Sequence, residues 1–325
     1  MKYRTIGSTG LSVSQICLGC MGLVGPEQTE KDSIATIHAA MDCGINFFDT
    51  ARGYQSGKNE ELLGRVIKGG REKVVIATKL NKLEPARISE QCEESLRRLT
   101  TDHIDLYQIH WPVRDANYPE ALSALEKLRR QGKIRAIGVS NFGVSYLRDI
   151  LATGIRVEAN QLHYNLIWRP IEHELQPLCV ENGVSILCYS ALNTGLLTGK
   201  FSSPDEVPPE RTQHRLFSSK RPSSRHSAPG CERELFEALK RVREIADSLN
   251  EPMSVITSAW LLGRPGVASI IAGARFPEQV KENVRASEAT LSEEVTALLT
   301  EVSEPIKAYA GKNCDQWEDV SRMER

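Results

Sequence analysis

The strongest constraint on the fold is a regular alternation of short β-rich runs with helical patterns along nearly the whole chain. Helices are indicated by apolar residues three and four positions apart, as at Leu235, Leu239 and Val242. This βαβα order favours a parallel sheet or barrel. The predicted strands are Gln15–Leu18, Asn46–Thr50, Val74–Lys79, Ile104–His110, Ile134–Ser140, Val157–Leu162, Ser185–Ser190 and Ala268–Ala272. Eight such strands predict an α/β protein with a (β/α)8 TIM barrel.

Two segments are expected to extend this barrel. Tyr3–Ile6 and Leu11–Ile16 flank a glycine-bearing turn and predict an N-terminal β-hairpin that covers one barrel end. Residues 202–230 are rich in serine, proline and arginine and predict a long irregular loop. That loop is either a solvated, disordered insertion or a lid over the site.

The remaining segments complete one predicted domain. Extra helices are expected near Pro277–Ala286 and Ser292–Ile306, and a polar tail at 307–325 follows them. A length of 325 residues is ordinary for a barrel with insertions, so residues 1–325 are interpreted as a single domain.

Composition and charge narrow the class of partner. The chain is 40% apolar and 26% charged, as expected of a soluble globular protein. Its 41 Lys and Arg residues nearly balance 42 Asp and Glu residues, which argues against nucleic acid or an anionic membrane as partner. The N-terminus runs into polar turn residues instead of an apolar signal core. We therefore expect a cytoplasmic protein, a monomer or homo-oligomer, whose partner is a small molecule.

The eight cysteines are predicted to be free thiols, most of them buried. Cys43, Cys92 and Cys179 lie in apolar patterns. Cys17 and Cys20 have the C-x-x-C spacing of redox and zinc motifs, but no second pair or nearby histidine completes a ligand set. No metal site is predicted.

Polar side chains follow three consecutive predicted strands. Asp49, Lys79 and His110 stand at the ends of the second, third and fourth strands, and Tyr54 lies in the glycine-bearing loop after Asp49. Each has an ordinary alternative: a loop-capping aspartate, a solvated lysine, a core histidine, a packed tyrosine. Together they would bring four reactive groups to the barrel mouth, where barrel enzymes hold their catalytic residues. The combination favours a catalytic site.

The chemistry of this tetrad follows from charge. A phenol has a reference pKa of about 10 and is a poor acid at neutral pH unless a nearby cation favours its phenolate. Lys79 is predicted to supply that cation, with Asp49 holding it charged. His110 is predicted to donate to, or polarise, a substrate carbonyl, and Tyr54 to protonate the developing alkoxide.

The run Asp49-Thr50-Ala51-Arg52-Gly53-Tyr54, with Lys79 and His110, resembles the aldo-keto reductases. The resemblance spans nearly the whole chain. Further matching motifs are Gly138-Val139-Ser140-Asn141-Phe142, Gln161 with Tyr164-Asn165, Tyr189-Ser190-Ala191-Leu192, and Gly195-Leu196-Leu197-Thr198-Gly199-Lys200. The resemblance implies reversible, NAD(P)H-dependent reduction of aldehyde or ketone carbonyls, sugars possibly among them.

For the cofactor, the resemblance implies an extended nicotinamide dinucleotide lying across the barrel mouth. Ser140, Asn141 and Gln161 would hold the carboxamide, and Tyr189 would stack on the nicotinamide ring. The segment from Ser190 to Lys200 would wrap the pyrophosphate, consistent with the phosphate site that barrels often form after strands 7 and 8. The other cofactor contacts expected are Met21, Asp49, Ala191, Leu192, Gly195, Leu197, Gly273 and Glu282.

The last cofactor element begins near the predicted eighth strand. Pro277 marks a helix start, so Gln279 and Asn283 share one face, which in the family contacts the adenine. Arg275 is placed for the adenosine 2′-phosphate, with a surface salt bridge as its alternative. NADP(H) is therefore expected in preference to NAD(H).

Two departures from the family pattern concern the nicotinamide pocket. Ala191 stands where members often carry proline, and Cys20-Met21 stands where many carry threonine and tryptophan. The substrate is expected to touch Tyr54, His110 and Trp111. Trp111 and Trp168 are expected to form an aromatic wall or to pack in the core.

Two other functions stay open at this point. A lysine that ends a barrel strand forms a Schiff base in some aldolases, but it must then be neutral, whereas Asp49 should keep Lys79 charged. Some proteins of the same family serve as redox-sensing, NADPH-binding subunits of potassium channels.

Overall fold

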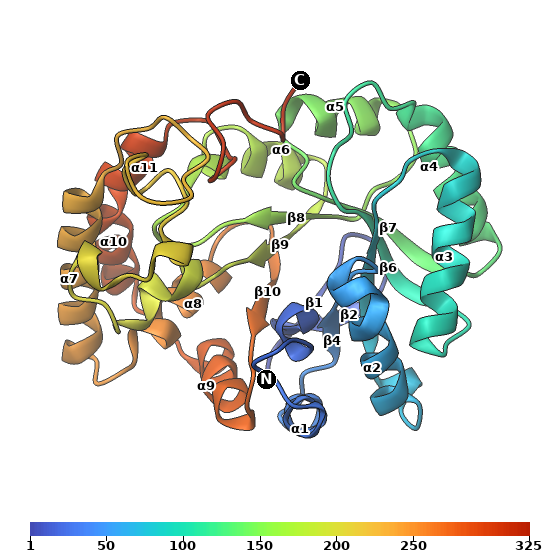
Figure 1. The fold of residues 1–325 in the computed structure, drawn as a ribbon, viewed down its shortest axis with the longest axis horizontal. Helices are drawn as coiled ribbons and strands as arrows, with labels where there is room; N and C mark the ends of the chain where they lie inside the picture. The colour runs from blue at the N-terminus through green and yellow to red at the C-terminus, as the bar shows by residue number, and fades with distance from the viewer.

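The computed structural model describes residues 1–325, and a closed barrel of parallel strands lies at its centre (Figure 1). The first and last barrel strands pair with each other, with Ile270 beside Ile16, and so close the barrel. The strands in spatial order are β3 (Ile16–Gly19), β4 (Phe47–Asp49), β5 (Val75–Leu80), β6 (Ile104–Ile109), β7 (Ile134–Ser140), β8 (Ala159–His163), β9 (Ser185–Tyr189) and β10 (Val267–Gly273). The predicted fold class is confirmed, with strand limits shifted by one or two residues at most.

Helices surround the barrel, as Figure 1 shows. The α-helices are α1 (Glu30–Asp42), α2 (Lys58–Ile67), α3 (Pro85–Leu99), α4 (Tyr118–Arg130), α5 (Val144–Ala152), α6 (Leu175–Glu181), α7 (Glu232–Ser248), α8 (Met253–Leu262), α9 (Pro277–Glu288), α10 (Glu293–Val302) and α11 (Glu304–Ala310). The 3-10 helices are η1 (Cys20–Leu23), η2 (Tyr54–Gly57), η3 (Arg71–Lys73), η4 (Pro170–Glu172), η5 (Asn193–Thr198), η6 (Pro204–Glu206) and η7 (Pro209–Arg211). Helix α3 is typical: Ile88, Cys92 and Leu96 are buried on one stripe against the strands.

The barrel wall separates two hydrophobic cores. The outer core lies between strands and helices. The inner core fills the barrel with side chains of differing size, including Phe47, Ala77 and Leu106, because alternate strand residues point inward. The inner core therefore leaves open only the end of the barrel where the strands finish.

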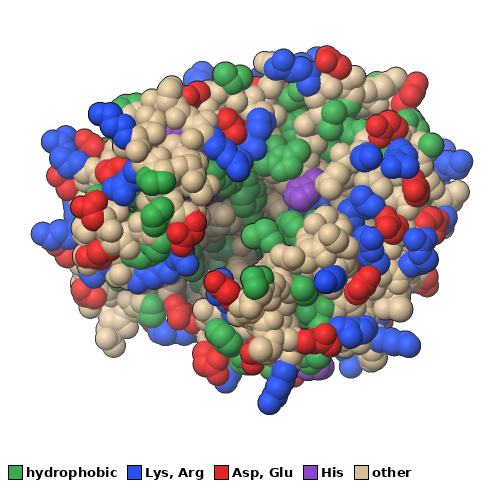
Figure 2. All heavy atoms as spheres, in the orientation of Figure 1, with side chains coloured by type: hydrophobic (Ala, Val, Ile, Leu, Met, Phe, Trp, Pro, Cys, Tyr) green, Lys and Arg blue, Asp and Glu red, His purple; other side chains and the backbone are tan.

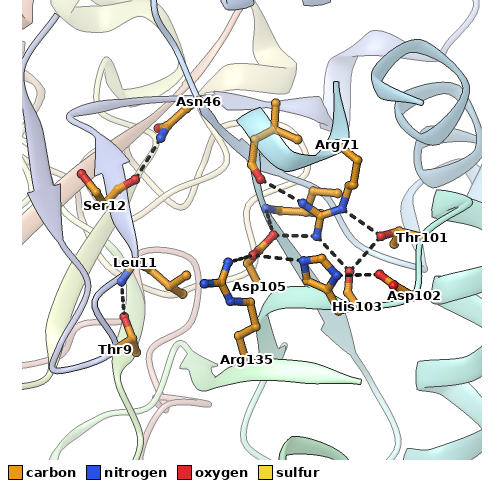
Figure 3. Close-up of polar contacts among 12 residues, drawn as sticks. Thr9, Leu11, Ser12, Asn46, Arg71, Thr101, Asp102, His103, Asp105 and Arg135 are labelled. Atoms are coloured by element: carbon orange, nitrogen blue, oxygen red, sulfur yellow. Dashed lines mark hydrogen bonds and ion pairs between the residues drawn. The ribbon is translucent and has the colours of Figure 1, made fainter. Parts of the chain in front are cut away.

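The predicted N-terminal hairpin closes the other end. Its strands β1 (Tyr3–Thr5) and β2 (Ser12–Ser14) are antiparallel. Ile6, Leu11 and Val13 extend from this hairpin into the inner core. The Asn46 amide ties the hairpin to the start of β4. Its Nδ2 donates to the Ser12 carbonyl (Figure 3). Its Oδ1 accepts from the Ser14 N–H.

A buried carboxylate joins three strands at this closed end. The Asp105 side chain accepts hydrogen bonds from Arg71 (2.7 Å), Arg135 (2.9 Å) and the Ile76 backbone N–H (2.9 Å). Figure 3 shows these groups converging with His103. Because the buried charge is met by two guanidinium groups and an N–H, the cluster is a structural tie between β5, β6 and β7.

Three predicted segments differ in detail. The 202–230 loop contains η6 and η7 and buries Leu216 and Phe217, so it is packed against the barrel and is not a solvated insertion. The helix predicted at Ser292–Ile306 is divided at Ser303, where Pro305 interrupts backbone hydrogen bonding. Helix α11 extends into the segment predicted as a polar tail.

The rest of that segment, residues 311–325, which we call the tail, reaches helix α5. The Met323 carbonyl accepts from the Gly143 N–H, and the Glu324 carboxylate accepts from the N–H groups of Val144 and Ser145. Gly143 follows β7, so the tail lies at the open end of the barrel (Figure 1).

Two further findings concern the whole chain. All eight cysteines are free and all but Cys43 are buried, as predicted. None of the helices has the length and apolar character needed to span a bilayer.

Candidate active site

The four predicted catalytic residues meet at the open end of the barrel. Asp49 ends β4, Lys79 lies in β5, His110 follows β6 and Tyr54 begins η2. The Lys79 Nζ lies 2.5 Å from Asp49 Oδ1 and 5.3 Å from the centre of the Tyr54 ring. The rings of Tyr54 and His110 meet edge to face, with centroids 5.9 Å apart.

Asp49 is the centre of a buried polar network. Its Oδ2 accepts from the amides of Gln161 (2.7 Å) and Gln108 (3.3 Å), while Lys79 also donates to the Thr50 carbonyl (2.9 Å). Gln108 was missed by the sequence analysis. The signal was present, because Gln108 lies two residues before His110 in a strand and so faces the same interior.

Burial and neighbouring charges shift the pKa values of Lys79 and Tyr54 in opposite directions. Burial lowers the pKa of the Lys79 ammonium, but the Asp49 carboxylate and the neighbouring Tyr54 raise it by more, so the net pKa is raised. Burial raises the pKa of Tyr54, and although the Lys79 charge lowers it, the net pKa stays above the ordinary value. The expectation of a phenol with a lowered pKa is therefore wrong for the free protein. Burial outweighs the ammonium, and Tyr54 is protonated at neutral pH.

His110 is a neutral imidazole. Burial, with the nearby Lys79 charge, lowers its pKa to about 3. Its Nδ1 lies 3.1 Å from the Asn81 amide oxygen, so Asn81 orients the ring. A neutral ring polarises a carbonyl by hydrogen bonding and not by charge.

Strained backbone is concentrated in the loops around the mouth. Gln55 and Ser56 after the tyrosine, and Asn141, Ser190 and Thr194 in the predicted cofactor loops, have positive φ angles between 47° and 61°. Such conformations are uncommon outside glycine and cluster at functional sites.

The residues predicted to hold a carboxamide are neighbours. Ser140 and Asn141 follow one another at the end of β7, and Ser140 Oγ donates to the Gln161 carbonyl (3.2 Å). The Tyr189 hydroxyl donates to Asn141 Oδ1 (2.8 Å), which fixes the ring at the mouth. The Gln161 Oε1 has no partner in the protein. A free amide oxygen at the end of β8 fits a ligand that carries a carboxamide, whose N–H groups would donate to it.

The segment from Ser190 to Lys200 forms a turn with two cations beside it. A Cβ added at Gly195 would lie 3.0 Å from Lys200 Nζ and 3.2 Å from Arg211 Nη1. Burial and the Arg211 charge lower the pKa of Lys200. Arg211, from the 202–230 loop, was missed by the sequence analysis. Of the other predicted contacts here, Ala191 and Leu197 are buried, and Leu192 is partly buried.

The predicted adenine segment is assembled beside β10. The Gln279 Oε1 accepts from the Arg275 N–H (2.7 Å), and Asn283 donates to the Gly273 carbonyl (3.2 Å). Glu282 is bound by the Ser254 hydroxyl. The Arg275 guanidinium pairs with Glu27 at 2.8 Å, the surface salt bridge that was its alternative. Outside this segment, Met21 is 65% exposed in η1, near α2.

Two tryptophans near the open end differ in their surroundings. Trp168 is fully buried and donates to the Cys314 carbonyl (3.2 Å), so it packs in the core. Burial in the core is the second of the two arrangements expected for Trp168, and the tryptophan that lies near the mouth is Trp317 of the tail. The imidazole of His163, buried at the end of β8, lies 5.1 Å from the Tyr189 ring and 5.2 Å from the Trp317 ring, and neither of its nitrogens has a partner. Figure 2 shows a hollow at the centre of this face, with hydrophobic side chains on its walls.

Comparison with known proteins decides the family. The sequence model described as the Aldo/keto reductase family matches residues 15–304. The chain belongs to this family. The aldo-keto reductase YhdN of Bacillus subtilis is 36% identical, with 94% of this chain and 96% of that protein covered. The NADH-specific methylglyoxal reductase of Escherichia coli is 32% identical, with 94% and 100% covered.

Solved structures agree with this assignment. The glycerol dehydrogenase AKR11B4 of Gluconobacter oxydans has a TM-score of 0.80 and 30% identity, with 92% of this reductase and 94% of that chain covered. A thermostable aldo-keto reductase, Tm1743, has a TM-score of 0.75 and 31% identity, with 93% and 100% covered. The present aldo-keto reductase is therefore an NAD(P)-dependent oxidoreductase of the barrel type, as the resemblance implied.

Proposed function

We propose that this protein reversibly reduces aldehyde or ketone carbonyls to alcohols and that Tyr54 is the proton donor. The observation that carries the proposal is the buried Lys79–Asp49 pair beneath the Tyr54 ring, at the open end of a closed barrel. Relatives named methylglyoxal reductase and glycerol dehydrogenase support chemistry at a carbonyl or alcohol carbon.

The residues divide the proton chemistry between them. A bound nicotinamide supplies the hydride. Tyr54, protonated at neutral pH, gives its proton to the oxygen of the reduced carbonyl, and the Lys79 ammonium stabilises the phenolate left behind. His110, neutral and oriented by Asn81, binds the same oxygen. In the alcohol-oxidising direction the Tyr54 phenolate takes the proton back.

The cofactor residues fit a nicotinamide dinucleotide. Ser140, Asn141 and Gln161 would bind the carboxamide, and Tyr189 would stack on the ring. Lys200, supported by Arg211, would face the pyrophosphate. NADP(H) in preference to NAD(H) is supported by the exposed Arg275 beside the N-terminus of α9. The Glu27 carboxylate opposes that preference, because a phosphate must displace it.

The buried pair disfavours the aldolase alternative. A Schiff base needs a neutral amine, whereas the Asp49 carboxylate raises the pKa of Lys79. Borohydride should therefore trap no imine with a carbonyl substrate.

Replacing Tyr54 with phenylalanine tests the proposal. With an aromatic aldehyde and NADPH, followed by absorbance, turnover should fall by about 10²- to 10⁴-fold while NADPH binding is kept. Tyr3→Phe, at the closed end, is the matched control and should leave turnover unchanged. An unimpaired Tyr54→Phe enzyme would remove the proposed acid. Tight NADPH binding by the wild type without turnover of any aldehyde would favour the channel-subunit alternative.

A further inference from the structure

An arginine of the tail is fixed at the mouth by a buried carboxylate. Arg322 binds Asp315 with two nitrogens, Nε at 2.7 Å and Nη2 at 2.9 Å. The Asp315 side chain is fully buried, whereas 42% of the Arg322 side chain is exposed. Asp315 also accepts from the backbone N–H groups of Trp317 and Arg322. The guanidinium is thus held in one orientation before any ligand arrives.

The held guanidinium faces the predicted substrate side of the site. Its Cζ lies 4.5 Å from the Trp111 ring and 5.9 Å from the Trp317 ring. Trp111 adjoins His110 in the sequence. Arg322 is also close enough to Tyr189 for its charge to act against the burial that raises the pKa of that phenol. Two aromatic rings of the mouth therefore lie against one cation.

One nitrogen of the Arg322 guanidinium is left without a partner. Nε and Nη2 hold Asp315, but Nη1 has no hydrogen-bond partner in the protein. With Asp315, the Glu318 carboxylate also helps to raise the pKa of Arg322, but Glu318 forms no ion pair with the guanidinium. Asp49 is occupied by Lys79 and two amides. The Nη1 group of Arg322 therefore lies on the side of the guanidinium that faces away from Asp315.

The geometry points to Arg322 as a specificity-determining residue that binds a carboxylate on the carbonyl substrate. This inference rests on the proposed carbonyl reduction. The Trp111 and Trp317 rings would pack against the apolar body of such a substrate, and Nη1 would bind its carboxylate. A singly charged carboxylate fits better than a phosphate, since Asp315 already neutralises most of the cation and only one nitrogen is left.

Two aldehydes of nearly equal shape test this inference. 4-Carboxybenzaldehyde carries the anion, and 4-nitrobenzaldehyde is its neutral counterpart. The ratio of kcat/KM for the two, acid over nitro compound, is measured for the wild type and for Arg322→Gln, Arg322→Lys and Arg325→Gln. Arg325 is the matched control: it also belongs to the tail, but it pairs with Asp149 and stacks on Tyr146, away from the mouth.

Arg322→Gln should lower the ratio about tenfold, mainly by raising KM for the acid. A tenfold change is the size expected for the loss of one charge-assisted hydrogen bond in a partly exposed site. Arg322→Lys should retain most of the ratio, and Arg325→Gln all of it. An equal loss on both aldehydes in Arg322→Gln would overturn the inference, since Arg322 would then only anchor the tail. An unchanged ratio would overturn it as well. If the wild type reduced neither aldehyde, the proposed function itself would fail.

Discussion

Replacing Lys79 with methionine should destabilise the protein far more than the loss of one side-chain contact. Lys79 is fully buried, the Asp49 side chain is 4% exposed, and their charged atoms lie 2.5 Å apart. Removing one partner of such a pair leaves an uncompensated buried charge, which lowers the free energy of unfolding by about 3–5 kcal/mol. The Gln161 and Gln108 amides still donate to Asp49, so Lys79→Met should fall near the lower end, about 3 kcal/mol.

Asp49→Asn should destabilise the protein more, because the buried Lys79 ammonium then has only two neutral acceptors, the Thr50 carbonyl and the new amide oxygen, and no counter-charge. The double variant Asp49→Asn, Lys79→Met carries no buried charge and should be more stable than either single variant. The two changes are therefore strongly non-additive.

Urea unfolding followed by tryptophan fluorescence and circular dichroism measures this cycle. The exposed pair Arg87–Glu90, 3.0 Å apart with half or more of each side chain exposed, is the control. Its cycle should give a coupling of about 0.5 kcal/mol or less. A double variant whose loss equals the sum of the two single losses would refute the view that the pair acts as one buried unit.

Two further outcomes follow from charges described above. Arg275→Ala should weaken the binding of NADPH more than that of NADH. Glu27→Gln should strengthen NADPH binding by about fivefold or less, since it frees an exposed arginine. Binding titrations of both cofactors measure these changes, and equal effects on the two would exclude a 2′-phosphate role. His110, His163 and His214 have pKa values lowered by burial to about 3, so the unfolded chain binds more protons between pH 6.5 and 3. Stability should be fully present above pH 6.5 and fall below it, by up to about 1.4 kcal/mol per pH unit for each imidazole. Urea midpoints that stay level from pH 7 to pH 5 would contradict this.

Most of the fold could be predicted from the spacing of apolar residues along the chain. Each barrel strand could be predicted because its run of apolar residues was short and bounded by turn residues, and the polar residues that end three of the strands marked the open end. Asp49, Lys79 and His110 could be grouped on that basis alone, because the ends of parallel strands meet at one rim. The role of each, and those of the cofactor residues, remain predictions.

What the sequence could not provide were contacts between segments far apart in the chain. Nothing local indicates that Arg211 reaches the turn at Gly195, or that Trp317 and not Trp168 lies beside the mouth. The net pKa of Tyr54 was misjudged for a related reason: the ammonium was foreseen from neighbouring strands, but the depth of burial opposing it depends on how the whole mouth packs.

The two ends of the chain lie at opposite ends of the barrel. Lys2 and Tyr3 are bound where the strands begin, to Ser287 and Gly44, whereas Met323 and Glu324 are bound where they finish. Any peptide or reporter joined after residue 325 would start beside α5, on the same end of the barrel as the mouth and three residues beyond Arg322. One joined before residue 1 would hang from the sealed base, which makes that end the better place for an affinity handle in enzyme assays.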